Sequence, residues 1–432
     1  MIVICEPICK AFSHEKVNSG FIYGLRLAYP NETLRFYAHA SHIKSIKEIL
    51  AYDKVVVENI EYIAVNFKDS STIGGALKYY FSFKKIFYEL KKVNTDKIFF
   101  LSYSPLIIYL IKKLKQHKDF LDLKFSFVLH GDFENIKTDT EQSNELKFPT
   151  YQIKQNKIIT LIQRIRKNRL ADYPSKIIKV SIRLLTSGLN KFRIDPSKRI
   201  HTKDILLWRS SPDFRYIALS PHIVKNAAKY IDIEKLNIQT VLFPTNFAKP
   251  LKQPDNEYVK FGIFGYGDSL VLSNIALKLS KKNIKANYEI RIIGMDNRGV
   301  EDFKNITAPS SGKPLARIDM EKYAEDIDVF LILYGKNKYK LGCSGSIIES
   351  LSYIKPILHF ENDCINSFNR LENPIGVCCN SIDQFVDKMI DIIENYKSYS
   401  LDFTTYRNNI IKLRDEHAIT NSLAQLRKSF TW

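Results

Sequence analysis

The segment 342–346 (GCSGS) places five small residues directly before the helix-like stretch 347–354. The first turn of a helix has unpaired backbone N–H groups and a partial positive charge, so it attracts anions. Small residues let phosphate oxygens reach these N–H groups, which a Cβ atom would obstruct. The segment therefore predicts a phosphate site that includes Ser344, Gly345 and Ser346, with the two serines adding hydroxyl donors.

Glu349 follows about one turn inside the same predicted helix. A carboxylate at this place can accept hydrogen bonds from the vicinal hydroxyls of a ribose, so the ligand we expect is a nucleoside diphosphate. The segment lacks the Lys-Ser/Thr pair of a P-loop, so it is not a P-loop nucleotide site. A glycine-rich helix cap followed by a surface glutamate remains the alternative interpretation.

The chain is strongly basic, and one segment carries most of the excess charge. Its 432 residues include 65 Lys and Arg against 46 Asp and Glu, for a net charge of +19, which predicts an anionic partner. Residues 151–215 hold 16 Lys and Arg against 4 Asp. Ile158, Leu161 and Ile165 share one helical face there, so the segment predicts contact with an anionic membrane surface. An ordinary surface helix is the alternative.

Several classes of protein are disfavoured. The basic segment interleaves with aliphatic rather than stacking aromatic side chains, so no nucleic-acid partner is expected. The six cysteines have no metal-site spacing, and free thiols fit a reducing cytosol. The start of the chain reads as a strand, and the apolar run 98–111 is too short to cross a bilayer. We expect a cytoplasmic protein, with peripheral attachment to the inner face of the plasma membrane as an option.

Short β-rich runs alternate with helix-like segments, a pattern typical of α/β proteins with parallel sheets. The alternation of strands and helices begins again after residue 215, which predicts two similar Rossmann-like halves. The expected strands are 2–6, 33–39, 97–103, 124–130, 216–220, 238–244, 258–267, 288–294, 328–334 and 356–360. The expected domains are 1–248 (with the basic segment 151–215), 256–405, and a C-terminal helix, 406–432.

The segment GCSGSIIESLSYIKPIL (342–358) resembles the donor site of GT-B glycosyltransferases, close to the large retaining family 4. FGIFGYG (261–267) is similar to the opening strand and glycine turn of their nucleotide-binding domain. Residues 96–133 and 216–247 resemble parts of their acceptor domain. The resemblance implies two Rossmann-like domains facing each other across a cleft, with the C-terminal helix crossing back to the N-terminal domain.

The resemblance adds Gly265, Tyr266 and Gly267 to the donor-binding residues Ser344, Gly345, Ser346 and Glu349. Lys338 and Lys340 complete the donor-binding set, because they could replace the basic residues that the family usually has after the first glycine turn. Lysines and the helix terminus would neutralise the diphosphate, so neither a metal nor a cofactor is expected. No DxD metal motif is assigned, because Asp326-Ile327-Asp328 leads into an apolar strand.

On the acceptor side, His130 ends a predicted strand and could hydrogen-bond the donor sugar or move a proton. Asp132 is a candidate general base if the reaction inverts the configuration of the sugar, and Glu15 is a second candidate for the same role. Each also has a plain structural interpretation, as a strand-end, turn or loop residue. The candidate acceptor- or sugar-binding residues are His14, Asn18, Ser19 and Gly20, which precede a predicted helix.

The chain also departs from the family pattern. Leu341 stands where the family often has a glutamate, and no arginine follows the turn at 265–268. The glycine pair usual near the N-terminus is replaced by HEKVNSG (14–20). The donor sugar and the stereochemistry are therefore left open.

The expected function is metal-independent transfer of a hexose from a UDP- or GDP-sugar to a glycan or polyprenyl-linked acceptor. Heavy use of Lys, Ile and Asn indicates an AT-rich bacterial genome. By association with such bacteria, the expected pathway is that of a surface polysaccharide, O-antigen or capsule. Two alternatives stay open: a nucleotide-sugar 2-epimerase of the same fold, and a non-catalytic basic protein that binds membrane or nucleic acid.

Overall fold

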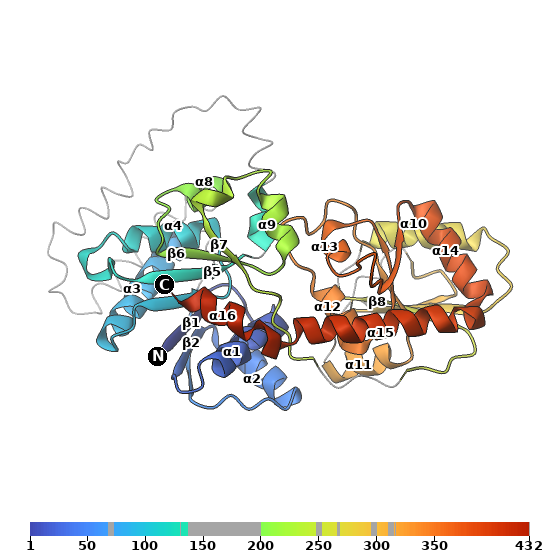
Figure 1. Cartoon of the computed structure of the whole chain (residues 1–432), viewed down its shortest axis with the longest axis horizontal. Coiled ribbons are helices and arrows are strands. Elements are labelled where there is room, and N and C mark those ends of the chain that lie inside the picture. Colours follow the sequence, from blue (N-terminus) through green and yellow to red (C-terminus); the bar gives the residue numbers. More distant parts are fainter. Residues whose placement is uncertain are drawn as a thin grey trace, which may run out of the picture.

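The computed structural model describes residues 1–67, 73–129, 131–136, 200–247, 253–265, 268–294, 300–309, 315 and 317–431. Two parallel sheets with helices on their faces form two domains (Figure 1). Most of the basic segment 151–215 lies outside the described residues, so its predicted membrane contact stays a prediction.

The N-terminal sheet has seven parallel strands in the order β3-β2-β1-β4-β5-β6-β7. The strands are β1 (Ile2–Glu6), β2 (Leu34–Ala38), β3 (Ile60–Ala64), β4 (Lys97–Phe100), β5 (Lys124–Val128), β6 (Phe214–Ala218) and β7 (Asn237–Thr240). The helices are α1 (Glu15–Ala28), α2 (Ala40–Tyr52), α3 (Ile73–Lys92), α4 (Pro105–Leu114), α8 (Thr202–Leu207) and α9 (Pro221–Ala227). The strand order reverses between β1 and β4, and parallel sheets bind ligands at the carboxyl ends of such a switch point.

The C-terminal sheet repeats this plan in the order β10-β9-β8-β11-β12-β13. Its strands are β8 (Val259–Phe264), β9 (Tyr288–Ile293), β10 (Ile306–Thr307), β11 (Val329–Ile332), β12 (Ile357–Phe360) and β13 (Gly376–Cys379). Its helices are α10 (Ser269–Ser280), α11 (Arg317–Glu325), α12 (Gly345–Tyr353), α13 (Asp363–Asn366), α14 (Ile382–Glu394) and α15 (Ser400–His417). The switch point lies between β8 and β11, and α12 follows the loop after β11.

Local sequence explains where several elements begin. Ser104 caps α4 by accepting a hydrogen bond from the backbone N–H of Ile107 at 3.4 Å, and Pro105 occupies the first turn, as predicted. β1 is buried along its whole length, as its apolar run indicates for a central parallel strand. The elements that were not predicted are β3, α3, α8, β10, α13, β13 and α14.

The last helix crosses back to the N-terminal domain, which confirms the prediction (Figure 1). α15 runs along the C-terminal domain, and α16 (Leu423–Phe430) packs against α1. The ring of Phe430 stacks on Phe99 of β4 at 5.6 Å, and Arg215 donates to the carbonyl oxygens of Lys428 and Thr431. The predicted boundary at residue 406 falls inside α15, because the turn between the two helices comes at 418–422.

α1 begins at Glu15, whereas the sequence predicted a helix over 20–29, so Gly20 lies inside the helix and not at its start. Gly20 lies inside the helix, where a Cβ atom would come within 2.0 Å of the carbonyl oxygen of Pro244. The glycine therefore permits the close passage of the 244 segment over α1. This packing is the role that the structure shows for Gly20, and its sugar-binding role stays a prediction.

We expect Gly20→Ala to destabilise the fold by about 3 kcal/mol, because the added methyl group must displace backbone. The clash outweighs the gain in helix propensity, which is about 1 kcal/mol. Urea unfolding measures the difference. The matched control is Gly131→Ala, since a Cβ there has no heavy atom within 4 Å. Equal stability of the two variants would contradict the close packing at Gly20.

A second prediction concerns His359 on β12, which is fully buried. One ring nitrogen bonds the carbonyl oxygen of Phe360 at 2.7 Å, and the other faces the Asn369 side-chain nitrogen at 2.7 Å. Burial lowers the pKa of His359 from 6.5 to about 4. The unfolded chain therefore binds more protons between pH 6.5 and 4.

Stability should be complete above pH 6.5 and should fall toward pH 4, with this one group contributing about 1.4 kcal/mol per pH unit. His359→Gln should flatten that part of the profile, as measured by urea unfolding at a series of pH values. An unchanged slope in the variant would show that His359 does not titrate in this way.

Candidate functional site

The amino end of α12 is open, as the phosphate-site prediction requires. The helix begins at Gly345, with Ser344 as its N-cap residue. Gly345 is exposed, and a Cβ atom there would have no neighbour within 4 Å. Ser346 is half-buried beside it. Backbone N–H groups at this end can therefore be approached by an anion.

A glycine turn at the end of β8 faces this helix terminus. Gly265 has φ +70°, which favours glycine, and a Cβ atom there would lie 2.9 Å from the Ser346 hydroxyl oxygen. Gly294, which ends β9, has φ +91° and stands beside Gly265. The structure thus brings together two predicted donor-binding segments that are about 80 residues apart in the sequence. Tyr266 and Gly267 lie outside the described residues.

Ser344 needs a correction. Its side chain is fully buried, and its hydroxyl donates to the hydroxyl oxygen of Tyr334 at 3.0 Å. The hydroxyl thus fixes the loop to the end of β11, and it is not presented at the open helix terminus. Ser346 keeps the predicted position.

The loop between β11 and α12 carries the predicted lysines. Lys338 is exposed and Lys340 is half-buried, while Lys336 forms an ion pair with Glu361 at 3.1 Å. Leu341, which replaces the glutamate of the family pattern, is fully buried. Lys338 and Lys340 therefore bring positive charge to the loop that leads into α12.

The N-terminal domain holds this loop through contacts that the sequence did not predict. His222 of α9 bonds the carbonyl oxygens of Tyr339 at 3.2 Å and Gly342 at 3.0 Å. Asn226, also of α9, donates to the carbonyl oxygen of Lys340 at 3.1 Å. From the 131–134 turn, a Glu134 carboxylate oxygen accepts the backbone N–H of Leu341. The loop conformation is thus set jointly by both domains.

Glu349 also meets the N-terminal domain. Its carboxylate pairs with Lys16 of α1 at 3.1 Å, and Lys16 also donates to the Ser352 hydroxyl at 3.0 Å. The Lys16 and Glu349 side chains are only 16% and 13% exposed. The glutamate predicted to bind ribose therefore lies at the domain interface, one helical turn from the open end of α12. No local sequence signal identifies Lys16, because its partners are over 330 residues away.

The acceptor-side candidates separate into two groups. His14 is exposed and forms the N-cap position of α1 in a left-handed conformation (φ 54°). Glu15 is the first residue of the helix and is half-buried, so it is not a loop residue as expected. Both precede Lys16 in the sequence, and the side chain of Lys16 contacts α12. Asn18 and Ser19 are instead buried within the helix, and their role as binding residues stays a prediction.

Asn18 belongs to a buried cluster around Glu6, which ends β1 at the switch point. The Asn18 amide nitrogen contacts Glu6 at 3.0 Å and His42 at 2.9 Å. The Glu6 carboxylate also accepts the backbone N–H groups of Ile8 and Cys9, at 2.8 and 2.9 Å, and the Ser102 hydroxyl. Because all these donors converge on one buried carboxylate, Glu6 fixes the loop between β1 and α1.

Asp132 lies in a short 3₁₀ turn (Gly131–Glu134) after β5. Burial raises the pKa of its carboxyl group above the usual 3.8, the direction that makes a carboxylate a better proton acceptor. Glu134, two residues on, contacts the donor loop, so this turn faces the C-terminal domain. His130 lies outside the described residues.

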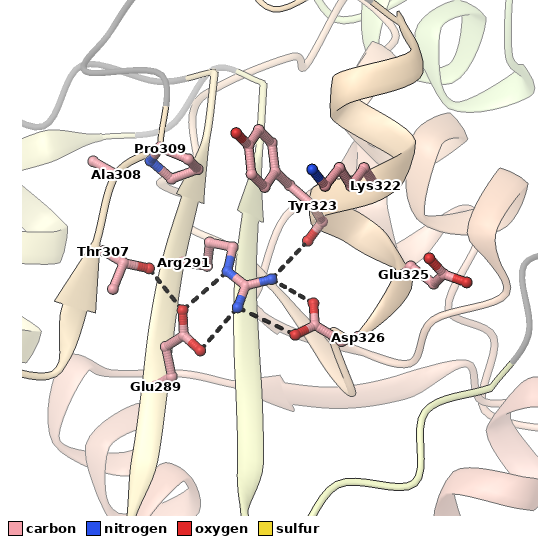
Figure 2. A pocket seen from close by; sticks show the side chains of 9 residues that line it. All are labelled: Glu289, Arg291, Thr307, Ala308, Pro309, Lys322, Tyr323, Glu325 and Asp326. Atoms are coloured by element: carbon pink, nitrogen blue, oxygen red, sulfur yellow. Dashed lines mark hydrogen bonds and ion pairs between the residues drawn. The ribbon is translucent and has the colours of Figure 1, made fainter.

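A separate open pocket of about 660 Å³ lies between β9, β10 and α11 (Figure 2). Arg291 points into it but is already bound by Glu289, by Asp326 and by the carbonyl oxygen of Tyr323. None of the predicted site residues lines this pocket. It is therefore distinct from the open end of α12.

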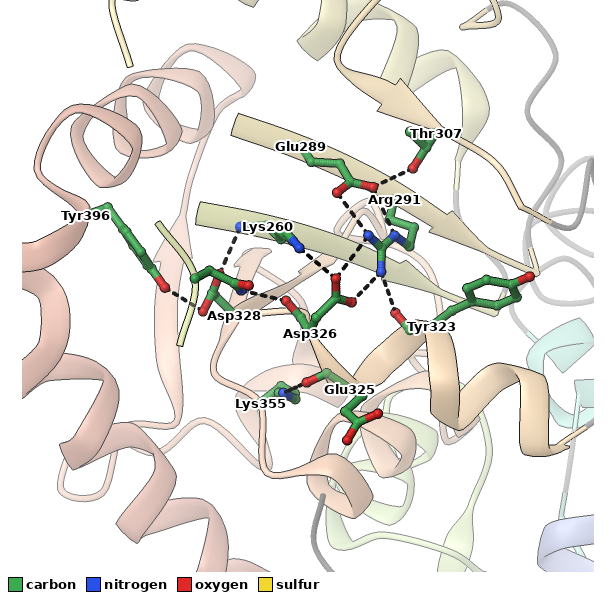
Figure 3. A network of polar contacts seen from close by, with 11 residues as sticks. Lys260, Glu289, Arg291, Thr307, Tyr323, Glu325, Asp326, Asp328, Lys355 and Tyr396 are labelled. Carbon is green, nitrogen blue, oxygen red and sulfur yellow. Dashed lines mark hydrogen bonds and ion pairs between the residues drawn. The ribbon is translucent and has the colours of Figure 1, made fainter. Parts of the chain in front are cut away.

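The two aspartates of the apparent DxD sequence have structural partners (Figure 3). Asp326 binds Arg291 and also Lys260, the latter at 2.7 Å. Asp328 is buried and accepts the backbone N–H of Lys260 at 2.9 Å and the Tyr396 hydroxyl at 2.8 Å. Within the described part of the chain, no group of three or more His, Cys, Asp or Glu side chains could hold a metal ion.

Solved glycosyltransferases have a similar fold. A glycosyltransferase from Rickettsia africae matches with a TM-score of 0.56 and 12% identity, covering 99% of this chain and 97% of that one. The lipopolysaccharide outer core galactosyltransferase WaaB matches with a TM-score of 0.56 and 11% identity, covering 99% of this chain and 98% of that one. Anabaena HepE, solved with UDP and glucose, matches with a TM-score of 0.54 and 8% identity, covering 99% of both chains.

This chain has the GT-B fold. At these identities the likeness establishes architecture alone. No protein-family model matches the chain, and a search of curated protein sequences gives no match. Among the helices that the structure describes, none combines the length and apolar character needed to span a bilayer.

The Lys16–Glu349 contact can be tested by a double-mutant cycle. We expect Lys16→Met and Glu349→Gln to show a coupling free energy of about 1 kcal/mol in unfolding experiments, because both side chains are largely buried.

The exposed Lys336–Glu361 pair has the same 3.1 Å separation and serves as the matched control. Its coupling should be below about 0.5 kcal/mol. Additive effects of Lys16→Met and Glu349→Gln would mean that the contact does not join the domains.

Proposed function

We propose that the protein is a glycosyltransferase that uses a nucleoside-diphosphate sugar, UDP- or GDP-linked, as donor. The observation that carries the proposal is the position of Gly265 beside Ser346 at the open end of α12, at the switch point of the C-terminal sheet. This arrangement offers backbone N–H groups to a diphosphate. Glu349 lies one turn further along the helix, where a ribose would extend. The neighbour HepE, which was solved with UDP and glucose, supports this choice of ligand class.

Each part of the proposed site has a task in sugar transfer. The bond between the sugar C1 and the diphosphate oxygen breaks, and its electron pair leaves with the diphosphate. The N–H groups of α12, the Ser346 hydroxyl and the nearby Lys338 and Lys340 stabilise the charge that develops. An oxygen of the acceptor hydroxyl bonds to C1. On an inverting course Asp132 takes the hydroxyl proton, and on a retaining course the departing phosphate takes it.

We further propose that transfer needs neither a metal nor a resident cofactor, because the helix terminus and the lysines supply positive charge. For the acceptor we propose a glycan or polyprenyl-linked glycan of a bacterial surface polysaccharide, O-antigen or capsule. The excess of basic residues supports this choice, since the lipid pyrophosphate and the membrane surface that carries it are anionic. The proposed location is the cytoplasm, at the inner face of the membrane.

Titration calorimetry with UDP and with GDP tests the donor site. One nucleotide should bind with a micromolar Kd, and Glu349→Ala should weaken binding at least tenfold, a loss of about 1.4 kcal/mol. The control is Glu372→Ala, at an exposed position of the C-terminal domain outside the proposed site. Absence of binding by a folded protein to either nucleotide would refute the proposed donor site.

A further inference from the structure

The exposed side of α3 carries a regular stripe of basic and aromatic side chains. It consists of Lys78, Phe81, Lys85, Tyr88 and Lys92, all exposed and spaced three or four residues apart. Residues at this spacing share one helix face. The α3 stripe, as we call these five residues, extends over about 21 Å at a rise of 1.5 Å per residue.

The rest of α3 is firmly anchored, so the stripe lies on a rigid support. Phe83, Phe87 and Leu90 are fully buried in the N-terminal core, and the helix packs against α4. On the outer side, Phe81 stays 43% and Tyr88 38% exposed. The Tyr88 ring packs on Phe120 at 4.9 Å and its hydroxyl donates to Asp119 at 3.3 Å, yet both rings keep a solvent-exposed part on the same line of the helix.

Positive charge dominates this helix. Five lysines stand against one acidic residue, Glu89. Glu89 is half-buried: its carboxylate accepts the Tyr37 hydroxyl at 2.9 Å and pairs with Lys85 at 3.7 Å. The Lys85 side chain is still 80% exposed. The outer face of α3 therefore presents an excess of ammonium groups around the two rings.

We propose that the α3 stripe binds the surface of a membrane that contains anionic lipids. Lysines at this spacing can pair with lipid phosphates, and the Phe81 and Tyr88 rings can enter the headgroup layer between them. A single-stranded nucleic acid is a poorer match, because such ligands usually follow a positively charged groove and the stripe lies on the convex surface of one helix. The predicted membrane contact of residues 151–215 involves other residues of the chain.

The direction of α3 relates the stripe to the edge of the N-terminal sheet where an acceptor would bind. The helix follows β3 and runs back along the sheet, so its first turns lie near the carboxyl ends of the strands. A membrane lying along the stripe would therefore pass beside the edge where acceptors enter. This use rests on the proposed glycosyltransferase function, whereas membrane binding itself does not.

Sedimentation of the full chain with lipid vesicles tests the proposal. The protein should bind phosphatidylglycerol-containing vesicles and should bind pure phosphatidylcholine vesicles far more weakly. The triple variant Lys78→Gln/Lys85→Gln/Lys92→Gln should lower the partition coefficient about 100-fold, from about 1 kcal/mol per lysine. The control Leu277→Ala/Lys281→Ala removes an exposed apolar side chain of α10 and the basic side chain that follows its last residue, and it should bind like the original chain.

Fluorescence locates the contact. Phe81→Trp should show a blue-shifted emission on anionic vesicles, while Leu277→Trp, at a position of similar exposure (47%), should not. Circular dichroism checks that each variant is folded. These readouts do not depend on nucleotide binding, so failure of the proposed donor site would leave them unaffected.

Three outcomes would overturn the proposal: no binding of the unaltered chain to anionic vesicles, undiminished binding by the triple lysine variant, or no emission shift for Phe81→Trp. Titration with a single-stranded oligonucleotide separates the competing ligand class. Binding of the oligonucleotide through the same lysines, without vesicle binding, would assign the stripe to nucleic acid instead.

Discussion

In the loop between β11 and α12, several backbone carbonyl and N–H groups form hydrogen bonds with side chains of the N-terminal domain. His222 and Asn226 bond three of its carbonyl oxygens, and Glu134 accepts a backbone N–H. A buried backbone group without a partner would cost free energy, so these contacts hold the loop in one conformation. The shape of the proposed phosphate site thus depends on the relative position of the two domains.

The apolar core reinforces this dependence. The buried side chains Ile347, Ile348 and Leu351 of α12 belong to a hydrophobic cluster that continues into the N-terminal domain. A second cluster, on the other face of the C-terminal sheet, is confined to that domain. The helix that carries the proposed donor site is therefore packed on the shared side. Movement between the domains would shift α12, its amino end and Glu349 together.

The sequence predicted those parts of the fold that local pattern determines. Continuous apolar runs located the central strands, and small residues before an apolar helix located the open end of α12. β3 was missed because it is an edge strand with half-exposed side chains, and β10 because it has only two residues. The early start of α1 was missed because His14 gives no usual capping signal, and this error placed Asn18 and Ser19 ahead of the helix.

The site itself was only partly predictable, for a physical reason. Ser346 could be assigned because it belongs to a run of small residues before a helix, and Gly265 was assigned through the resemblance of 261–267 to the glycine turn of GT-B glycosyltransferases. Lys16, Glu134 and His222 matter through partners that are far away in the sequence, and no single-chain pattern encodes such pairings. The Ser344 hydroxyl was misassigned for the same reason, since its partner Tyr334 belongs to the preceding strand end.

The return of α16 to the N-terminal domain has a consequence for how the protein is made. Phe99 lies in a strand that leaves the ribosome early, yet Phe430, the ring that stacks on it, is synthesised more than 300 residues later. The N-terminal sheet therefore keeps an uncovered apolar face while the entire second domain is being translated. The domain that begins to fold first can be completed only after its neighbour has formed.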